Sequence, residues 1–243
     1  MQVLSGERMS GPQRISKIVD LEERQQVLNY LVRPDPVECR PVKILYFGHS
    51  FVQHMQDYMA ALPYYMGNFG LPFNEASVYF KSMSGAPVER LRKKHNLNLV
   101  NRMQPEIVML EIGTNDLSEP EKSPRYVHDQ VLELVREILD CRVRKVVVNQ
   151  VVRRGKKGLI GKDQDFEEKI HSYNHMMEDT LKHLPRTLFW HHRNMWGDIE
   201  ALVEDGTHLN DQGNKRVYRS VKGALKSVST EIRPAWRSRE FYY

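Results

Sequence analysis

Apolar runs of strand length alternate with longer amphipathic stretches from residue 42 to residue 228, and this alternation limits the chain to few folds. The runs are apolar on both faces, which is typical of strands buried in a parallel sheet. The stretches between them repeat apolar residues every three or four positions, which indicates helices with one buried face. We therefore predict an α/β domain with helices on both faces of a five-stranded parallel sheet. The predicted strands are 42–47, 77–80, 107–112, 146–152 and 188–191, and the predicted helices are 51–62, 88–103, 125–139, 166–184 and 211–228.

Short segments flank this domain. Residues 1–15 are polar and predict a disordered N-terminus, whereas residues 16–34 have the apolar spacing of a helix that prolines then end. The main domain is predicted over residues 42–230, followed by a C-terminal tail over 231–243. With 243 residues and 40% hydrophobic side chains, the chain can bury one sizeable core.

Composition excludes several classes of protein. The two cysteines, Cys39 and Cys141, cannot form a disulfide framework or a Cys-rich zinc module. The chain has no signal-peptide core and no run near the roughly 20 apolar residues of a membrane span. These features predict an intracellular, cytoplasmic protein without a transmembrane segment. The net charge of +5 permits nucleic-acid binding without predicting it.

The first predicted strand runs directly into Gly48-His49-Ser50, and a helical pattern follows. Ligands of open parallel sheets bind at the carboxyl ends of the strands, where Ser50 can present its hydroxyl. Its backbone N–H, near a helix N-terminus, faces any negative charge that develops there. The alternative interpretation is a serine that only caps the helix.

Two other strands end in groups that can donate hydrogen bonds to an anion. Gly85 follows the second strand, and a glycine lets a ligand approach the backbone N–H closely. Asn115 follows the third strand in the string Gly113-Thr-Asn-Asp, and its amide is a donor that does not titrate. Together with the N–H of Ser50, these groups predict a three-donor oxyanion hole. Each of the two residues could equally serve a turn or a helix cap.

A loop before the last predicted helix carries an aspartate and a histidine. The spacing of Asp205 and His208 lets the carboxylate accept from one ring nitrogen and leaves the other nitrogen free as a base. The alternative interpretation is an ordinary loop in which Asn210 or Asp211 caps the helix.

Four motifs thus follow one another along the chain: Gly-x-Ser after the first strand, a glycine after the second, Gly-x-Asn-Asp after the third, and Asp-x-x-His before the last helix. Chance rarely arranges all four in this order. In this combination the chain resembles the SGNH hydrolases, also called GDSL esterases and lipases, from about residue 42 to residue 228. The resemblance implies a flavodoxin-like three-layer α/β/α sandwich, with Ser50 as nucleophile, His208 as base and Asp205 as orienting acid. It implies Ser50, Gly85 and Asn115 as oxyanion donors, and neither a metal nor a cofactor. Members of this family hydrolyse esters, thioesters and acetyl groups on lipids, glycans and small molecules.

A narrower resemblance concerns the C-terminal segment. The run from Asp205 to Asn210, with Gly213 and residues 218–225, resembles esterase domains in the first open reading frame of some non-LTR retrotransposons and related host genes. The chain departs from the wider family at His49, where Asp is usual. Because adjacent residues of an extended chain point apart, we predict a structural role for His49 rather than a second base.

Three further features fit ordinary structural roles. His191 and His192 lack a third ligand at metal-site spacing, and Cys141 is interpreted as a buried or incidental thiol. A basic loop follows the fourth strand and is either a solvated surface or a rim that attracts anionic substrate or nucleic acid. Its charged residues are Arg153, Arg154, Lys156, Lys157 and Lys162.

The sequence thus predicts a serine esterase that hydrolyses carboxylic esters, with acetyl or other short acyl groups as the expected substrates. Anionic and lipid esters are further candidates, and the sequence indicates no oligomeric state. The alternative is a hydrolase fold that has lost its chemistry and binds RNA or protein in a retroelement-like context.

Overall fold

A computed structural model describes residues 40–63, 66–159, 165–195 and 197–232. Backbone contacts divide the chain after Arg40, and the sheet with its helices belongs to the unit that starts at Pro41. The predicted segments 1–15 and 16–34, as well as Cys39, Lys162 and residues 233–243, lie outside the described residues.

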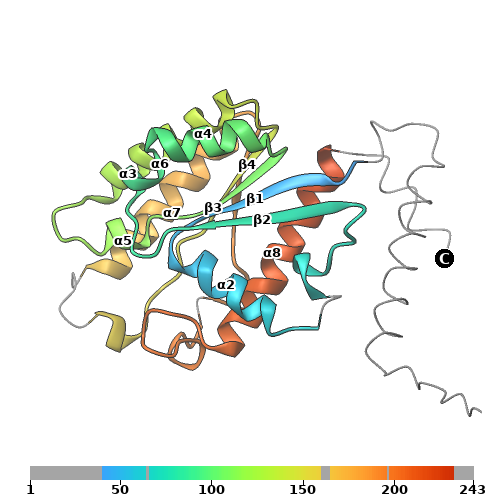
Figure 1. The fold of residues 1–243 in the computed structure, drawn as a ribbon. Helices are drawn as coiled ribbons and strands as arrows, with labels where there is room; N and C mark the ends of the chain where they lie inside the picture. The colour runs from blue at the N-terminus through green and yellow to red at the C-terminus, as the bar shows by residue number, and fades with distance from the viewer. Residues whose placement is uncertain (1–39, 64–65, 160–164, 196, 233–243) are drawn as a thin grey trace, which may run out of the picture. The chain divides into compact units, whose positions relative to one another are not determined.

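Five parallel strands form one sheet in the order β2-β1-β3-β4-β5, which is the flavodoxin-like strand order (Figure 1). The strand bounds are β1 Val42–Gly48, β2 Ala76–Ser82, β3 Ile107–Glu111, β4 Lys145–Asn149 and β5 Thr187–Trp190. Gly48 pairs with Ser82 on one side and with Glu111 on the other, so three strands end at the same level. The loops that leave these ends must therefore meet at one edge of the sheet.

Helices cover both faces of this sheet, and Figure 1 shows the two layers. The helices α2 and α8 pack on one face, and the layer with α3, α4, α6 and α7 packs on the other. Each face of the sheet packs into its own hydrophobic core, and successive strand residues point to opposite faces. In β3, for example, Leu110 is buried in one core and Met109 in the other. The helix bounds are α2 Ser50–Ala60, α3 Val88–Leu91, α4 Lys94–Met103, α5 Thr114–Leu117, α6 Pro124–Asp140, α7 Phe166–His183 and α8 Asp211–Ile232, with short 3₁₀ turns η2 Asn68–Gly70, η3 Lys156–Leu159 and η4 Glu200–Leu202. The predicted α/β class and five-stranded parallel sheet are confirmed.

The helix predicted over 88–103 is wrong as a single element. The structure breaks it into α3 and α4, with Lys93 in a non-helical conformation (φ −57°, ψ 137°) between them. The Asn96 amide donates to the carbonyl of Arg90 at 2.8 Å and so satisfies a group that a continuous helix would have bonded internally. The side chain of Arg92 bonds to Glu137 of α6, which fixes the break against the neighbouring helix.

Two other boundaries differ from the prediction by three or more residues. The strand predicted over 146–152 ends at Asn149, because the Asn174 side chain of α7 bonds both the N–H and the carbonyl of Val151, at 3.0 and 2.9 Å. At the other end of the domain, α8 continues past the predicted end at residue 228 to Ile232. Its last turn includes Glu231, which pairs with Lys145 at 2.7 Å.

Candidate functional site

The candidate nucleophile lies at the turn between β1 and α2. Ser50 is the first residue of α2 and is half-buried. His49 precedes it as the N-cap residue, and its Nδ1 accepts a hydrogen bond from the backbone N–H of Phe51 at 3.3 Å. A Cβ on Gly48 would collide with the carbonyl oxygen of Glu111, so only glycine allows β1 and β3 to approach this closely. The sharp, capped turn therefore holds Ser50 at the edge of the sheet.

His208 joins Ser50 to Asp205. Its Nδ1 donates to Asp205 Oδ2 at 2.7 Å, and its Nε2 lies 3.3 Å from Ser50 Oγ, which places that nitrogen to accept the hydroxyl proton. The second carboxylate oxygen of Asp205 accepts from the backbone N–H groups of Thr207 and His208, at 2.8 and 2.7 Å. Burial alone would raise the pKa of Asp205, but the hydrogen bonds from His208 and Thr207 outweigh it and lower that pKa. An ionised Asp205 fixes both the orientation and the tautomer of the imidazole.

Gly85 and Asn115 lie together beyond the ends of β2 and β3. Gly85 has φ +67°, which favours glycine, and the space that a Cβ would occupy is open. The Asn115 amide donates to the carbonyl of Ala86 at 3.2 Å, so it lies beside the Gly85 turn. Within the described residues, no hydrogen bond joins these two residues to Ser50. The structure thus links Ser50, His208 and Asp205 in one chain of hydrogen bonds and places Gly85 and Asn115 as a separate pair at the same sheet edge.

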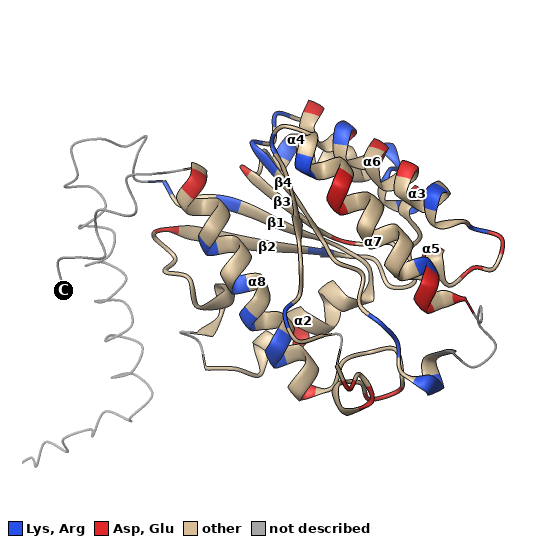
Figure 2. Cartoon of the chain, turned by 180° about the vertical axis from the view of Figure 1, so that it is seen from behind, with Lys and Arg blue, Asp and Glu red and all other residues tan. Residues whose placement is uncertain are grey.

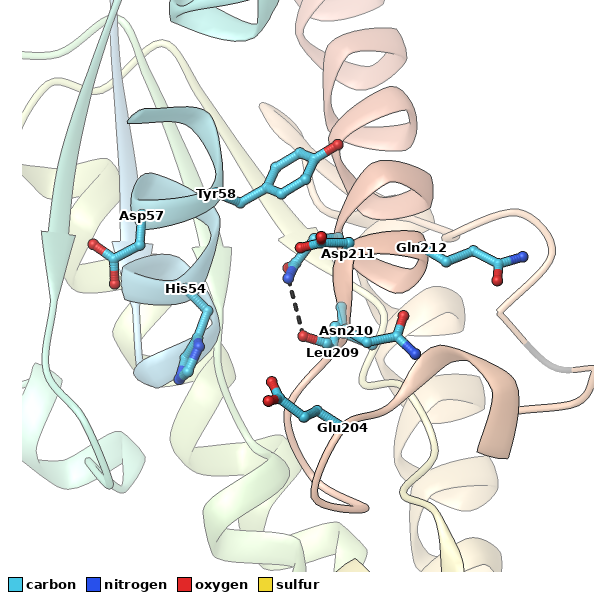
Figure 3. Close-up of a pocket in the computed structure, with 9 residues that line it drawn as sticks. His54, Asp57, Tyr58, Glu204, Leu209, Asn210, Asp211 and Gln212 are labelled. Carbon is cyan, nitrogen blue, oxygen red and sulfur yellow. Dashed lines mark hydrogen bonds between the residues drawn. The ribbon is translucent and has the colours of Figure 1, made fainter. Parts of the chain in front are cut away.

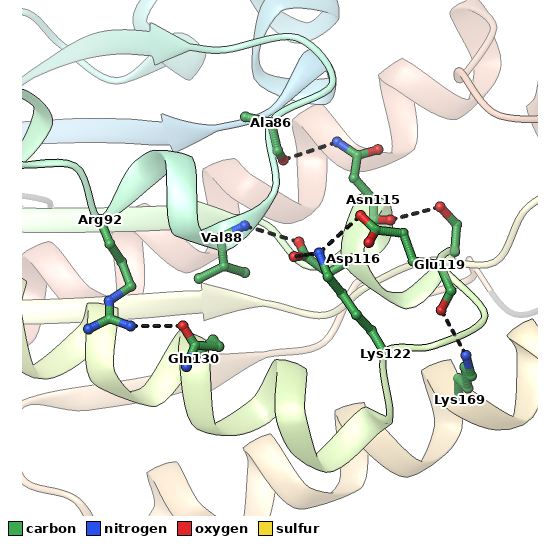
Figure 4. A network of polar contacts seen from close by, with 10 residues as sticks. Ala86, Val88, Arg92, Asn115, Asp116, Glu119, Lys122, Gln130 and Lys169 are labelled. Atoms are coloured by element: carbon green, nitrogen blue, oxygen red, sulfur yellow. Dashed lines mark hydrogen bonds and ion pairs between the residues drawn. The ribbon is translucent and has the colours of Figure 1, made fainter.

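Asp116, next to Asn115, connects the segments that carry Gly85 and Asn115 (Figure 4). Its carboxylate accepts from the backbone N–H of Val88 at 3.0 Å and pairs with Lys122 at 3.1 Å. Burial raises the pKa of Asp116, and the contacts with Lys122 and Val88 oppose that shift. The start of α3 and the turn that carries Asn115 are therefore held by one carboxylate.

A buried polar cluster lies behind the Ser50 turn. Glu111 at the end of β3 accepts from the Tyr46 hydroxyl at 2.9 Å and from the Asn149 amide at 2.8 Å, and its carboxylate lies 3.7 Å from His192 Nε2. Burial alone would raise the pKa of Glu111, but His192, His49 and Asn149 together lower it. Burial lowers the pKa of His49 to about 4. An ionised carboxylate and a neutral imidazole thus support the turn, as expected for a structural His49.

A cavity of about 550 Å³ opens beside His208, between α2 and the start of α8 (Figure 3). His54 on α2 stacks on the His208 ring, with the ring centroids 4.3 Å apart. Burial, together with the charge of His208, lowers the pKa of His54. Three carboxylates line this cavity, from Asp57, Glu204 and Asp211. The cavity therefore presents negative charge next to the candidate base.

Sequence reasoning missed both His54 and Glu111. His54 follows Ser50 by four residues, but the predicted helix began at residue 51, whereas α2 begins at Ser50 and places both residues on one face. Glu111 is a lone carboxylate at the end of an otherwise apolar strand, and that pattern could have identified it.

The other candidate residues have separate partners. His191 pairs with Glu178 at 2.9 Å, whereas His192 lies near Ser220 at 3.0 Å. Burial raises the pKa of the Cys141 thiol, which disfavours the nucleophilic thiolate. Asn210 caps α8 by accepting from the N–H of Gly213 at 3.0 Å. Over the described ranges, no three His, Cys, Asp or Glu side chains form a group that could hold a metal ion, and no helix has the length and apolar character that a membrane span requires.

Solved structures of similar fold come from several hydrolases. A GDSL-like lipase from Bacteroides thetaiotaomicron has a TM-score of 0.58 at 17% identity and covers 85% of this chain and 97% of its own. A carbohydrate esterase family 3 protein from Talaromyces cellulolyticus also has a TM-score of 0.58, at 15% identity, with coverage of 78% and 99%. A catalytic mutant of an acetylxylan esterase from Geobacillus stearothermophilus has a TM-score of 0.56 at 15% identity, with coverage of 77% and 94%. At these identities the structures establish the fold alone.

Sequence comparison identifies the family. A search of curated proteins gives no match, whereas the model of the GDSL-like Lipase/Acylhydrolase family matches residues 46–216. This range begins within β1, ends within α8 and includes more than half of the chain. The chain therefore belongs to the GDSL-like lipase/acylhydrolase family.

Proposed function

We propose that this protein is a serine esterase that hydrolyses carboxylic esters with acetyl or other short acyl groups. The observation that carries the proposal is the chain of hydrogen bonds from Ser50 through His208 to Asp205, with separations of 3.3 and 2.7 Å. Membership of an acylhydrolase family supports an ester substrate. The acetylxylan esterases among the proteins of similar fold support a short acyl group.

In the first half of the reaction, Ser50 Oγ attacks the ester carbonyl carbon while His208 Nε2 takes the hydroxyl proton. Asp205 holds the ring and stabilises the imidazolium that forms. The carbonyl oxygen becomes an oxyanion, for which we assign the N–H groups of Ser50 and Gly85 and the Asn115 amide as donors. When the ester C–O bond breaks, His208 gives its proton to the leaving alcohol.

In the second half, water releases the acyl group from Ser50. His208 takes a proton from this water as it attacks the acyl-enzyme carbonyl, and then returns the proton to Ser50 Oγ as the carboxylic acid leaves. The same oxyanion donors serve both halves.

The test combines ester hydrolysis with labelling by a fluorophosphonate, which reacts only with an activated serine. Ser50→Ala and His208→Ala should each lower kcat for p-nitrophenyl acetate by at least about 10⁴-fold and abolish labelling. Asn115→Ala should cost on the order of 10² to 10³ in kcat. Asp205→Asn should impair activity without unfolding the protein, because the amide favours the wrong histidine tautomer.

The exposed Ser227 on α8 and His95 on α4 provide matched controls. Ser227→Ala and His95→Ala should retain labelling and activity. Full activity of Ser50→Ala would refute the assignment of the nucleophile. Absence of labelling in the unaltered protein would favour a hydrolase fold that has lost its chemistry. The resemblance to retrotransposon esterase domains and the binding of nucleic acid stay predictions.

A further inference from the structure

The four basic residues that the structure describes in the loop after β4 differ sharply in environment. Arg153 pairs with Glu167 at 2.6 Å, whereas Lys156 and Lys157 are exposed on η3. Arg154 is buried, with 5% of its surface exposed. Only this residue combines a fixed position with burial, so any selective recognition of an anion by the described part of the loop depends on it.

The direct contacts of Arg154 with the described residues include no ion pair. Its Nη2 donates weakly to the carbonyl and hydroxyl oxygens of Thr114, at 3.3 and 3.4 Å. The guanidinium carbon lies over the Phe166 ring, 4.9 Å from the ring centroid. Its buried Nε has no hydrogen-bond partner. No carboxylate of the described residues lies within ion-pair distance of the guanidinium. An arginine stays charged when buried, and a buried charge without an ion-pair partner destabilises the fold.

Arg154 lies between the two halves of the candidate active site. Thr114, which its guanidinium contacts, immediately precedes the candidate oxyanion donor Asn115. The next residue, Gly155, donates from its backbone N–H to the carbonyl of Gly206 at 2.7 Å, and Gly206 follows Asp205. Figure 2 shows the basic segment after β4 and the acidic loop before α8 at the same end of the sheet. Burial lowers the pKa of Arg154, and the charge of Asp205 opposes this shift.

We propose that Arg154 binds a carboxylate at the far end of the substrate's acyl group, so that the preferred substrates are monoesters of short dicarboxylic acids. This inference rests on the proposed esterase function. A guanidinium fork suits a carboxylate, which would supply the direct ion-pair partner that the described residues do not provide. The leaving alcohol must lie beside His208, which gives it a proton. The cavity there is lined by the carboxylates of Asp57, Glu204 and Asp211, which would repel an anionic alcohol. We therefore assign the substrate's carboxylate to the acyl group and not to the alcohol.

Two matched ester pairs test the proposal. In the acyl pair, mono-p-nitrophenyl adipate is compared with the p-nitrophenyl ester of adipamic acid, which replaces the carboxylate by a neutral amide. In the alcohol pair, 4-acetoxybenzoate is compared with 4-acetoxybenzamide. We expect the unaltered protein to have a kcat/KM about 10- to 100-fold higher for the adipate than for the adipamate, the range of one charge-assisted contact. The acetoxybenzoate should show no such preference.

Arg154→Gln should abolish the adipate preference, measured as the ratio of the two kcat/KM values. Arg153→Gln removes the same charge from the neighbouring position, whose arginine already pairs with Glu167, and should keep the preference. Circular dichroism and thermal unfolding establish that each variant folds. If Arg154→Gln does not fold, the comparison of adipate with adipamate in the unaltered protein still decides the proposal.

A binding measurement separates this inference from the proposed function. Ser50→Ala, titrated calorimetrically with the same two acyl esters, should bind the adipate more tightly without turnover, and adding Arg154→Gln should remove the difference. If no ester is hydrolysed but this difference persists, the esterase proposal fails and the anion site stands. Equal binding and equal kcat/KM for adipate and adipamate would overturn the anion site. A carboxylate preference confined to the acetoxybenzoate would overturn its assignment to the acyl side.

Discussion

At the scale of single residues, His49 caps the N-terminus of α2. Its Nδ1 accepts from the Phe51 N–H, which is the role that a side-chain oxygen usually fills at this position. The imidazole is buried with 1% of its surface exposed, and the backbone N–H of His49 bonds to the carbonyl of Glu111. An aspartate here would place a second carboxylate near the buried Glu111. The departure at His49 is therefore matched to the carboxylate at the end of β3.

Acidification should destabilise the fold through His49. In the unfolded chain this residue binds a proton below pH 6.5, whereas in the folded protein its pKa is about 4. The unfolded state therefore binds more protons between these values, and about 3 kcal/mol of stability is lost as the pH falls through this window. His49→Asn keeps a capping oxygen without a titrating group, so its free energy of unfolding should fall less over the same range.

Urea denaturation at several pH values from 4 to 7.5 measures this difference. His95→Asn, which alters an exposed histidine, should follow the unaltered protein. Parallel pH profiles for His49→Asn and the unaltered protein would show that His49 is not the group responsible.

At the scale of elements, one short turn determines where the candidate oxyanion donors lie. The four-residue helix α5 carries Asn115 and Asp116 directly after β3, and Asp116 ties this turn to the first residue of α3. No periodic pattern predicts an element this short. The same contact explains why α3 starts where it does, since the Asp116 carboxylate bonds the otherwise free N–H of Val88.

Asp116→Asn should reduce both stability and catalysis. The amide oxygen can still accept from Val88, but the ion pair with Lys122 is lost, and we expect a cost of about 3 kcal/mol in the free energy of unfolding. Because the turn would hold Asn115 less firmly, kcat for p-nitrophenyl acetate should fall more than KM changes.

Steady-state kinetics and urea unfolding on the same preparation test this prediction. Glu121→Gln removes an exposed carboxylate from the same loop and should change neither quantity by much. A stable Asp116→Asn variant with unchanged kcat would mean that the Asn115 turn is positioned by other contacts.

At the scale of the whole molecule, two hydrophobic cores share one sheet. The buried clusters lie on opposite faces, and neighbouring residues of the central strand β3 enter different clusters. Leu110→Ala and Met109→Ala each remove a fully buried side chain, one from each cluster. Each should lower the free energy of unfolding by about 2 to 5 kcal/mol.

Both variants should still unfold in a single transition, because neither core can persist without the strands that they share. Urea titrations followed in parallel by far-UV and near-UV circular dichroism measure this. Two separated transitions in either variant would show that the helical layers unfold independently.

Much of the fold could be predicted from the sequence, since strand-length apolar runs and helical periodicity are local patterns that burial imposes on any α/β chain. These patterns located the five strands and placed Ser50, Gly85 and Asn115 directly after strand ends. They failed where a distant side chain decides the backbone, as Asn174 does at the end of β4 and Asn96 does at the break between α3 and α4.

The sequence by itself determined the order of elements and the kinds of side chain at their ends. Only the tertiary structure decided which of those side chains meet. Ser50 and His208 are 158 positions apart, and they come within 3.3 Å because the sheet and α8 bring their loops together. The burial of Arg154 and the stacking of His54 on His208 likewise depend on packing between separate segments. Local periodicity records which face of an element is buried, but contact between distant residues depends on how the buried faces pack in three dimensions.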